Sequence, residues 1–194
     1  MNPLDFRIVL IRTCKTDWDD QDRLTGTLDV PLNDEGRSTA VDIARQLELF
    51  SFSVIISAPC LAAQETSGIL ATELGLRVRT DSSLVNVDLG MWQGKQISEL
   101  KNCQPTLLRN WQESPDLVAP PHGETTDSVR SDVQKSLKRW TRKYRESNII
   151  LVVPEPLASV VKSELQNEPV CELKQLPRRC GHWEWIQPTT KVLA

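Results

Sequence analysis

Short runs of apolar residues recur along the chain, separated by longer segments in which apolar residues are spaced as in helices. Three of these runs, residues 6–11, 52–56 and 148–153, are rich in Ile and Val, which is typical of strands buried on both faces of a sheet. Residues 77–80 predict a further short strand. The pattern therefore predicts a sheet whose main strands have no solvent-facing side.

Helices are predicted between these strands. Residues 33–47 open with cap-type and acidic side chains and continue with apolar residues at spacings of three and four. Residues 61–74 predict a second helix, which Gly75 ends. A third, long helix is predicted over residues 124–144, whereas the Gly- and Pro-rich residues 86–125 predict loops.

Strands that alternate with helices predict an α/β fold, a three-layer α/β/α sandwich around a mainly parallel sheet. The chain has 194 residues and no internal repeat, low-complexity tract or linker, so we expect one domain over residues 1–194. Its net charge of -3 argues against overall affinity for nucleic acid or for a membrane surface. Because no apolar run is long enough to span a membrane and no secretory signal is visible, we expect a cytoplasmic protein.

Metal, cofactor and disulfide chemistry are not expected from the sequence. Its five cysteines are scattered and lack the close pairing of metal ligands: Cys14, Cys60, Cys103, Cys171 and Cys180. An odd number of dispersed cysteines is typical of reduced thiols in a cytosolic protein rather than of a disulfide framework. There are only two histidines, His122 and His182, which is too few for the usual zinc sites.

Candidate chemistry lies just after the predicted strands, where ligands of open α/β sheets bind. Residues 12–18 (RTCKTDW) follow the first strand and residues 57–59 (SAP) follow the second. Residues 84–94 (LVNVDLGMWQG) and 120–125 (PPHGET) stand in the loop region. In order and spacing, over about residues 6–165, these motifs resemble the histidine phosphatase superfamily, and the resemblance implies a fold of the phosphoglycerate mutase-like type.

The resemblance also implies a set of catalytic groups around one phosphoryl group. The family uses a nucleophilic histidine, a second histidine, two arginines and an acid that protonates the leaving oxygen, a set suited to phosphoryl transfer. Arg12 occupies the position of the first arginine, and Lys15 stands where the family usually has Glu. The nucleophile, second arginine, acid and second histidine are replaced by Thr13, Ala62, Asn86 and Glu155, respectively. A carboxylate at the last position would repel a phosphate about 4 Å away by roughly 1–4 kcal/mol.

These replacements predict a catalytically inactive pseudoenzyme that acts as a protein-binding, scaffold or regulatory module, with an unidentified protein partner. The degenerate phosphate pocket would consist of Arg12, Thr13, Cys14, Lys15, Ala62, Asn86 and Glu155. Within it, Arg12 and Glu155 are expected to form an ion pair. Two alternatives stay open: an altered phosphomonoesterase with a rebuilt site that uses Thr13 or Cys14, and a sensor that binds a small ligand in the remodelled pocket.

Other features suggest contacts with a ligand or partner. The candidate contact residues are Trp18, Trp92 and Glu124, together with Arg12, and the tryptophans, including Trp111, are expected on loops near the pocket mouth. Basic residues crowd the polar side of the long helix between Lys135 and Arg145, which is ordinarily a solvated face but also suits an acidic partner or nucleic acid. The tail, residues 171–194, departs from the family and predicts a final strand plus an arm with Arg and Trp side chains suited to an interaction surface.

Overall fold

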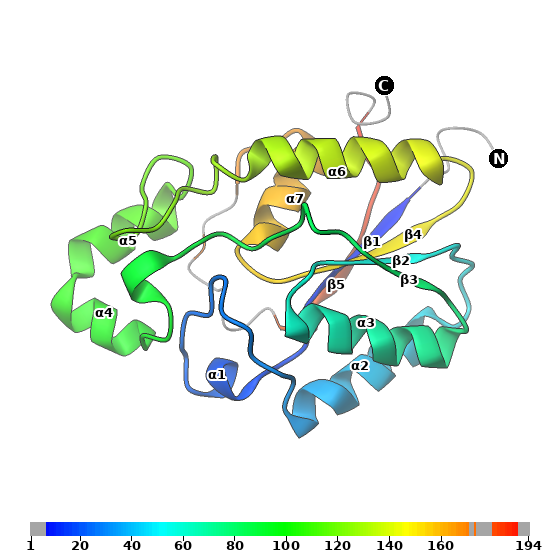
Figure 1. The fold of residues 1–194 in the computed structure, drawn as a ribbon, viewed down its shortest axis with the longest axis horizontal. Helices are drawn as coiled ribbons and strands as arrows, with labels where there is room; N and C mark the ends of the chain where they lie inside the picture. Colours follow the sequence, from blue (N-terminus) through cyan, green and yellow to red (C-terminus); the bar gives the residue numbers. More distant parts are fainter. Residues whose placement is uncertain (1–6, 171–172, 174–179, 190–194) are drawn as a thin grey trace.

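A five-stranded sheet forms the centre of the computed structural model, which describes residues 7–170, 173 and 180–189 (Figure 1). Its strands are β1 (Ile8–Arg12), β2 (Ile55–Ser57), β3 (Val78–Thr80), β4 (Ile149–Val153) and β5 (Trp183–Ile186). They lie in the order β3-β2-β4-β1-β5, and all neighbours are parallel except β5, which is antiparallel to β1. The predicted mainly parallel sheet is confirmed, and every predicted strand is present with bounds shifted by a few residues.

The two central strands bring the ends of distant segments together. Every residue of β1 and of β4 is buried, as their apolar sequences predict for all of them except Arg12. Arg12 at the end of β1 is the register partner of Val153 at the end of β4. The segments that follow these two strands therefore emerge side by side at the same edge of the sheet.

Helices cover both faces of the sheet, which completes the predicted three layers (Figure 1). Helices α2 (Asp34–Leu47) and α3 (Leu61–Leu74) pack against each other on one side, and α6 (Arg130–Lys143) and α7 (Leu157–Gln166) pack together on the other. The predicted helix ends are confirmed where capping residues mark them. Asn33 caps α2 through a 2.8 Å bond from the Gly36 N–H, and Gly75 ends α3 in the left-handed conformation.

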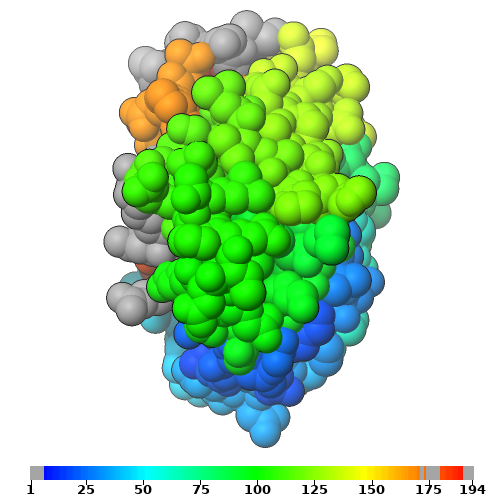
Figure 2. Space-filling view, turned by 90° about the vertical axis from the view of Figure 1, so that its left-hand side faces the viewer, coloured from blue at the N-terminus to red at the C-terminus, as the bar shows by residue number. Residues whose placement is uncertain are grey.

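The loop predicted over residues 86–125 is partly wrong. It contains the 3-10 turn η2 (Gly90–Trp92) and two helices, α4 (Ile97–Cys103) and α5 (Pro105–Glu113). Figure 2 shows that α4 and α5 (green) cover one side of the molecule, between the segment around α1 (blue; Asp17–Asp20) and α6 (yellow-green). The long helix predicted from residue 124 begins only at the start of α6. No helix in the described part of the chain is long and apolar enough to cross a membrane.

Asp81 joins the end of β3 to α6. Its side chain is buried and accepts hydrogen bonds from Ser136 Oγ at 2.5 Å and Trp140 Nε1 at 2.6 Å, and it pairs with Arg139 Nη2 at 2.5 Å. Burial alone would raise the pKa of Asp81, but the bonds from Arg139 and Ser136 outweigh it and lower the pKa well below its usual value. The ionised carboxylate therefore stabilises the folded state.

Replacing Asp81 with Asn is expected to lower the free energy of unfolding at pH 7 by about 1–3 kcal/mol, because buried donors lose a charged acceptor. The contribution of the wild-type carboxylate is fully present above its unfolded pKa of about 4 and is lost as the pH falls. The difference between Asp81→Asn and wild type should therefore shrink in urea unfolding curves recorded below about pH 4. A difference that grows on acidification would contradict this account.

Candidate functional site

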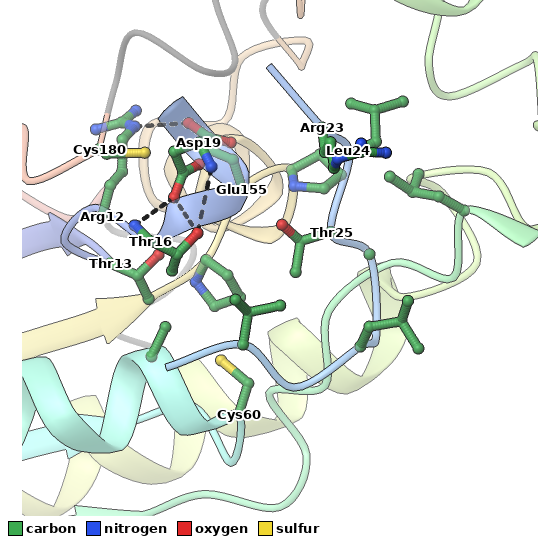
Figure 3. Close-up of a pocket in the computed structure, with 17 residues that line it drawn as sticks. Arg12, Thr13, Thr16, Asp19, Arg23, Leu24, Thr25, Cys60, Glu155 and Cys180 are labelled. Atoms are coloured by element: carbon green, nitrogen blue, oxygen red, sulfur yellow. Dashed lines mark hydrogen bonds and ion pairs between the residues drawn. The ribbon is translucent and has the colours of Figure 1, made fainter. Parts of the chain in front are cut away.

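A cavity opens at the edge of the sheet where β1 and β4 end (Figure 3). Arg12 and Thr13 come from the end of β1, residues 154–156 follow β4, and residues 23–26 form the opposite wall. Cys60 and Ala62 at the start of α3 and Cys180 just before β5 are also among the lining residues. Figure 3 shows Arg12, Asp19, Glu155 and Cys180 gathered on one side and Arg23 with Leu24 on the other.

Arg12 is the centre of a charged cluster. Its Nε donates to Glu155 Oε1 at 2.6 Å, its Nη1 donates to Glu184 Oε1 at 3.0 Å, and the same nitrogen lies 3.3 Å from His182 Nδ1. The ion pair predicted between Arg12 and Glu155 is therefore present. Burial by itself would lower the pKa of Arg12, but the charges of Glu155 and Glu184 outweigh it and raise the pKa, so the guanidinium stays charged.

Asn86 shapes the loop that carries Glu155. Its Nδ2 donates to the backbone oxygen of Glu155 at 2.9 Å, and its Oδ1 accepts from the Leu157 N–H at 3.2 Å. The Glu155 carboxylate is held in turn by Ser159, whose Oγ donates to Oε2 at 2.8 Å. Asn86 is not among the residues that line the cavity, so it acts on the site by holding the backbone.

Besides Asn86, two more residues predicted in the pocket, Lys15 and Cys14, lie outside it. Lys15 turns away and pairs with Asp20 at 2.6 Å and with Glu35 at 2.9 Å, and these carboxylates raise its pKa. Cys14 is fully buried in the core, where burial raises the pKa of its thiol to about 11. A protonated thiol away from the cavity is not a nucleophile for a bound substrate. Arg12, Thr13, Ala62 and Glu155 are the predicted pocket residues that do line the cavity.

Two charged cavity residues were missed by the sequence analysis. Asp19 Oδ2 accepts from the backbone N–H of Thr16 at 2.8 Å and from its Oγ1 at 2.6 Å, which fixes the carboxylate at the cavity wall. Arg23 is held by a 2.7 Å bond from its Nη1 to the backbone oxygen of Gly94. The Thr-x-x-Asp spacing of residues 16–19 is a capping-box signal that predicts the short helix α1, and it was the available clue to the position of Asp19.

Two further thiols line the cavity, and neither is activated. Burial raises the pKa of Cys60, and burial together with nearby Asp19 raises the pKa of Cys180. Reactive cysteines need the opposite shift, which cationic neighbours or a helix N-terminus supply. Among the lining residues that the structure describes, the charged side chains are two guanidinium groups and two carboxylates, those of Arg12, Arg23, Asp19 and Glu155.

The sequence profile of the histidine phosphatase superfamily (branch 1) matches residues 8–190, which include the segments that form this cavity. The chain belongs to this superfamily. The match includes β5 as well as the segments that carry the cavity. The resemblance noted in the motifs of residues 12–125 is thereby confirmed, and so is the predicted fold.

Several relatives of this superfamily member carry phosphatase names. Phosphoserine phosphatase 1 of Hydrogenobacter thermophilus is 27% identical over 146 residues, 75% of this chain and 69% of that protein. Glucosyl-3-phosphoglycerate phosphatase of Mycolicibacterium vanbaalenii is 32% identical over 189 residues, 93% of this chain and 83% of that protein. Other relatives are longer, and the match spans only 40% of a bifunctional protein of Mycobacterium tuberculosis. Mycobacterial glucosyl-3-phosphoglycerate phosphatase in complex with VO3 superimposes with a TM-score of 0.85 at 25% identity, over 96% of this chain and 93% of that one.

These matches contradict the prediction that this histidine phosphatase superfamily member is not an enzyme. Two relatives and a structural neighbour that each match three quarters or more of the chain are phosphatases by name. Inactivity was inferred position by position, from Thr13, Ala62, Asn86 and Glu155 alone. That inference did not include Asp19 and Arg23, which the fold brings into the same cavity from outside the motif positions.

The other candidate contact residues do not line the cavity of this superfamily member. Trp92 and Trp111 are fully buried and meet edge to face, with ring centroids 5.5 Å apart, so their predicted position on loops at the pocket mouth is wrong. Glu124 accepts from the backbone N–H of Asp88 at 2.9 Å and from Ser128 Oγ at 2.6 Å, which is a structural role. Trp18 is half-buried on α1.

Binding of a partner at the two predicted interaction surfaces stays a prediction. A shallow depression on α6 is lined by the basic residues Lys135, Lys138, Arg139, Arg142 and Lys143, and binding of a protein or nucleic acid there is untested. The predicted final strand is present as β5, where Trp185 stacks on Phe52 with centroids 5.6 Å apart. Arg178 and Arg179, predicted for the arm of the tail, lie outside the described residues. The single domain over residues 1–194 and the cytoplasmic location also stay predictions.

Proposed function

We propose that this chain is a phosphomonoesterase with a rebuilt site, which hydrolyses a phosphomonoester in the cavity at the ends of β1 and β4. The observation that carries the proposal is Arg12, whose guanidinium lines the cavity and stays charged. Phosphoryl transfer is accelerated mainly by positioning and by fixed positive charge, and a buried, preorganised arginine supplies both. Membership of a superfamily whose named relatives are phosphatases supports the same activity.

The remaining cavity groups define the chemistry. Because the thiols of Cys60 and Cys180 are held protonated, water is the nucleophile that fits the site best. Asp19 lines the cavity and, as a carboxylate held by Thr16, is suited to accept a proton from that water. Arg23 adds a second positive charge from the opposite wall.

Hydrolysis then proceeds by a direct displacement. The water oxygen forms a bond to phosphorus, the bond between phosphorus and the ester oxygen breaks, and its electron pair leaves with the ester oxygen. Asp19 takes one proton from the attacking water and releases it to solvent, and the ester oxygen takes a proton from a solvent water on its own side of phosphorus, which gives an alcohol and inorganic phosphate. One carboxylate acting as base on the attacking water is sufficient for this cycle.

The test compares wild type with Asp19→Asn and with Asp20→Asn as a matched control. Asp20 is the neighbouring carboxylate, pairs with Lys15 and does not line the cavity. Phosphate release would be measured from 4-nitrophenyl phosphate, phosphoserine, 3-phosphoglycerate and glucosyl-3-phosphoglycerate. We expect turnover by wild type and by Asp20→Asn, and a kcat about 10²–10⁴-fold lower for Asp19→Asn with little change in KM.

Two results would overturn the proposal. Failure of wild type to release phosphate from every ester would remove the activity itself. Equal turnover by wild type and Asp19→Asn would show that the release does not come from this cavity. Far-UV circular dichroism of the three proteins distinguishes a catalytic loss from a folding defect.

A further inference from the structure

Aliphatic side chains form a large part of the cavity wall beside the charged groups. The larger apolar residues that line it are Leu24, Leu28, Val30, Leu89, Pro154 and Pro156. Leu24 and Leu89 are buried, whereas Leu28 is 41% exposed, so the apolar surface extends from the interior of the cavity to its mouth. A ligand that enters past Leu28 would meet hydrocarbon before it reaches Arg12.

The described residues of the cavity wall carry equal numbers of positive and negative groups, and both guanidinium groups already have bonding partners. The lining residues that the structure describes include two guanidinium groups, of Arg12 and Arg23, and two carboxylates, of Asp19 and Glu155. Arg12 already pairs with Glu155 and Glu184, and Arg23 already bonds to the backbone of Gly94. The described wall therefore offers positive charge for one phosphoryl group and no surplus for a second anionic group.

We propose that the substrate of this site is a phosphomonoester whose alcohol part is uncharged and apolar, such as a benzyl or branched alkyl group. This inference rests on the proposed function. Contact with Leu24, Leu28 and Leu89 removes apolar surface of the alcohol from water, which favours binding. A carboxylate on the alcohol would instead face Asp19 and Glu155 and be repelled.

The experiment compares kcat/KM for benzyl phosphate and for phosphoserine. Both are esters of primary alcohols, so their intrinsic reactivities are similar. They differ mainly in the alcohol part, which is an apolar ring in benzyl phosphate and a charged amino acid in phosphoserine. The kcat/KM of wild type is expected to be at least about ten-fold higher for benzyl phosphate, because the ratio of the two values reflects how well the cavity binds each alcohol part in the transition state. Replacing Leu28 with Lys should reduce this preference several-fold by introducing positive charge and removing apolar surface at the mouth.

Leu49→Lys is the matched control, since Leu49 is 92% exposed in the turn after α2 and does not line the cavity. It should keep the wild-type preference. A kcat/KM of wild type for phosphoserine that equals or exceeds that for benzyl phosphate would overturn this inference and leave the proposed function standing. An unchanged preference for benzyl phosphate in Leu28→Lys would have the same consequence. If wild type hydrolyses other phosphomonoesters but neither of these two, calorimetric binding of benzylphosphonate against phosphonoacetate decides the inference: tighter binding of benzylphosphonate supports it, and tighter binding of phosphonoacetate overturns it.

Discussion

Replacing Arg12 with Ala is expected to abolish phosphomonoester turnover and to lower the free energy of unfolding by about 3–5 kcal/mol. The Arg12 side chain is only 3% exposed, and those of its partners Glu155 and Glu184 are 10% and 21% exposed. Without the guanidinium, Glu155 is left as a nearly buried carboxylate without its counter-charge, whereas Glu184 keeps its 2.6 Å pair with Lys162. The catalytic loss follows because the site loses its buried positive charge.

The stability defect of Arg12→Ala should depend on pH. Burial alone would raise the pKa of Glu184, but its pairs with Lys162 and Arg12 lower it, so its contribution to stability is present above its unfolded pKa and is lost as the pH falls. In Arg12→Ala, Glu184 keeps Lys162 but loses Arg12, so less of this contribution is left to be lost in acid. The deficit in urea unfolding relative to wild type is therefore expected to be large at pH 7 and smaller near pH 4.

Lys15→Ala serves as the control for the loss of a positive charge close to Arg12 in the sequence. The Lys15 side chain is 30% exposed, against 3% for Arg12, and faces Asp20 and Glu35, so its removal should change stability far less and leave turnover intact. Turnover that survives in Arg12→Ala would show that Arg12 does not act on the phosphoryl group. An unfolding free energy equal to that of wild type would show that the buried ion pairs contribute nothing to folding.

The strands and long helices could be predicted from the sequence because their apolar spacing follows directly from burial. The short helices α4 and α5 could not, since they lie in a segment rich in residues that break longer helices. Pro105 belongs to the segment for which the sequence predicts loops, but it occupies the first turn of α5, where its missing N–H is tolerated. The buried side chains Leu108 and Trp111 give α5 an apolar face that is too short to stand out in the sequence.

The site was only partly predictable, because motif positions do not reveal which way a side chain points. Arg12 and Glu155 could be paired from the sequence, since both follow adjacent buried strands. Lys15 lies only two residues from Thr13, yet its side chain turns to the surface. Cys180 reaches the cavity from the tail because β5 pairs with β1, and the Gly181 N–H donates to the backbone oxygen of Thr13 at 3.0 Å. The position of Cys180 in the cavity wall therefore depends on the pairing of distant strands rather than on local sequence.

Replacing Trp92 with Ala is expected to lower the free energy of unfolding by about 3–5 kcal/mol, the range for removing a buried aromatic side chain. Trp92 is 1% exposed, its ring meets that of Trp111 edge to face, and its Nε1 donates to Gln104 Oε1 at 2.9 Å. It therefore joins η2 to α4 and α5, and its loss would leave a cavity that these short helices cannot fill. Urea unfolding followed by circular dichroism measures the effect.

Met91→Ala is the control, because Met91 precedes Trp92 in the same turn and is 61% exposed, so its replacement should change stability by less than about 0.5 kcal/mol. The same pair of variants separates packing from ligand contact at Trp92. Under conditions where Trp92→Ala is still folded, its KM should match that of wild type, because the ring does not line the cavity. A raised KM with an unchanged unfolding free energy would assign Trp92 to substrate binding instead of to the core.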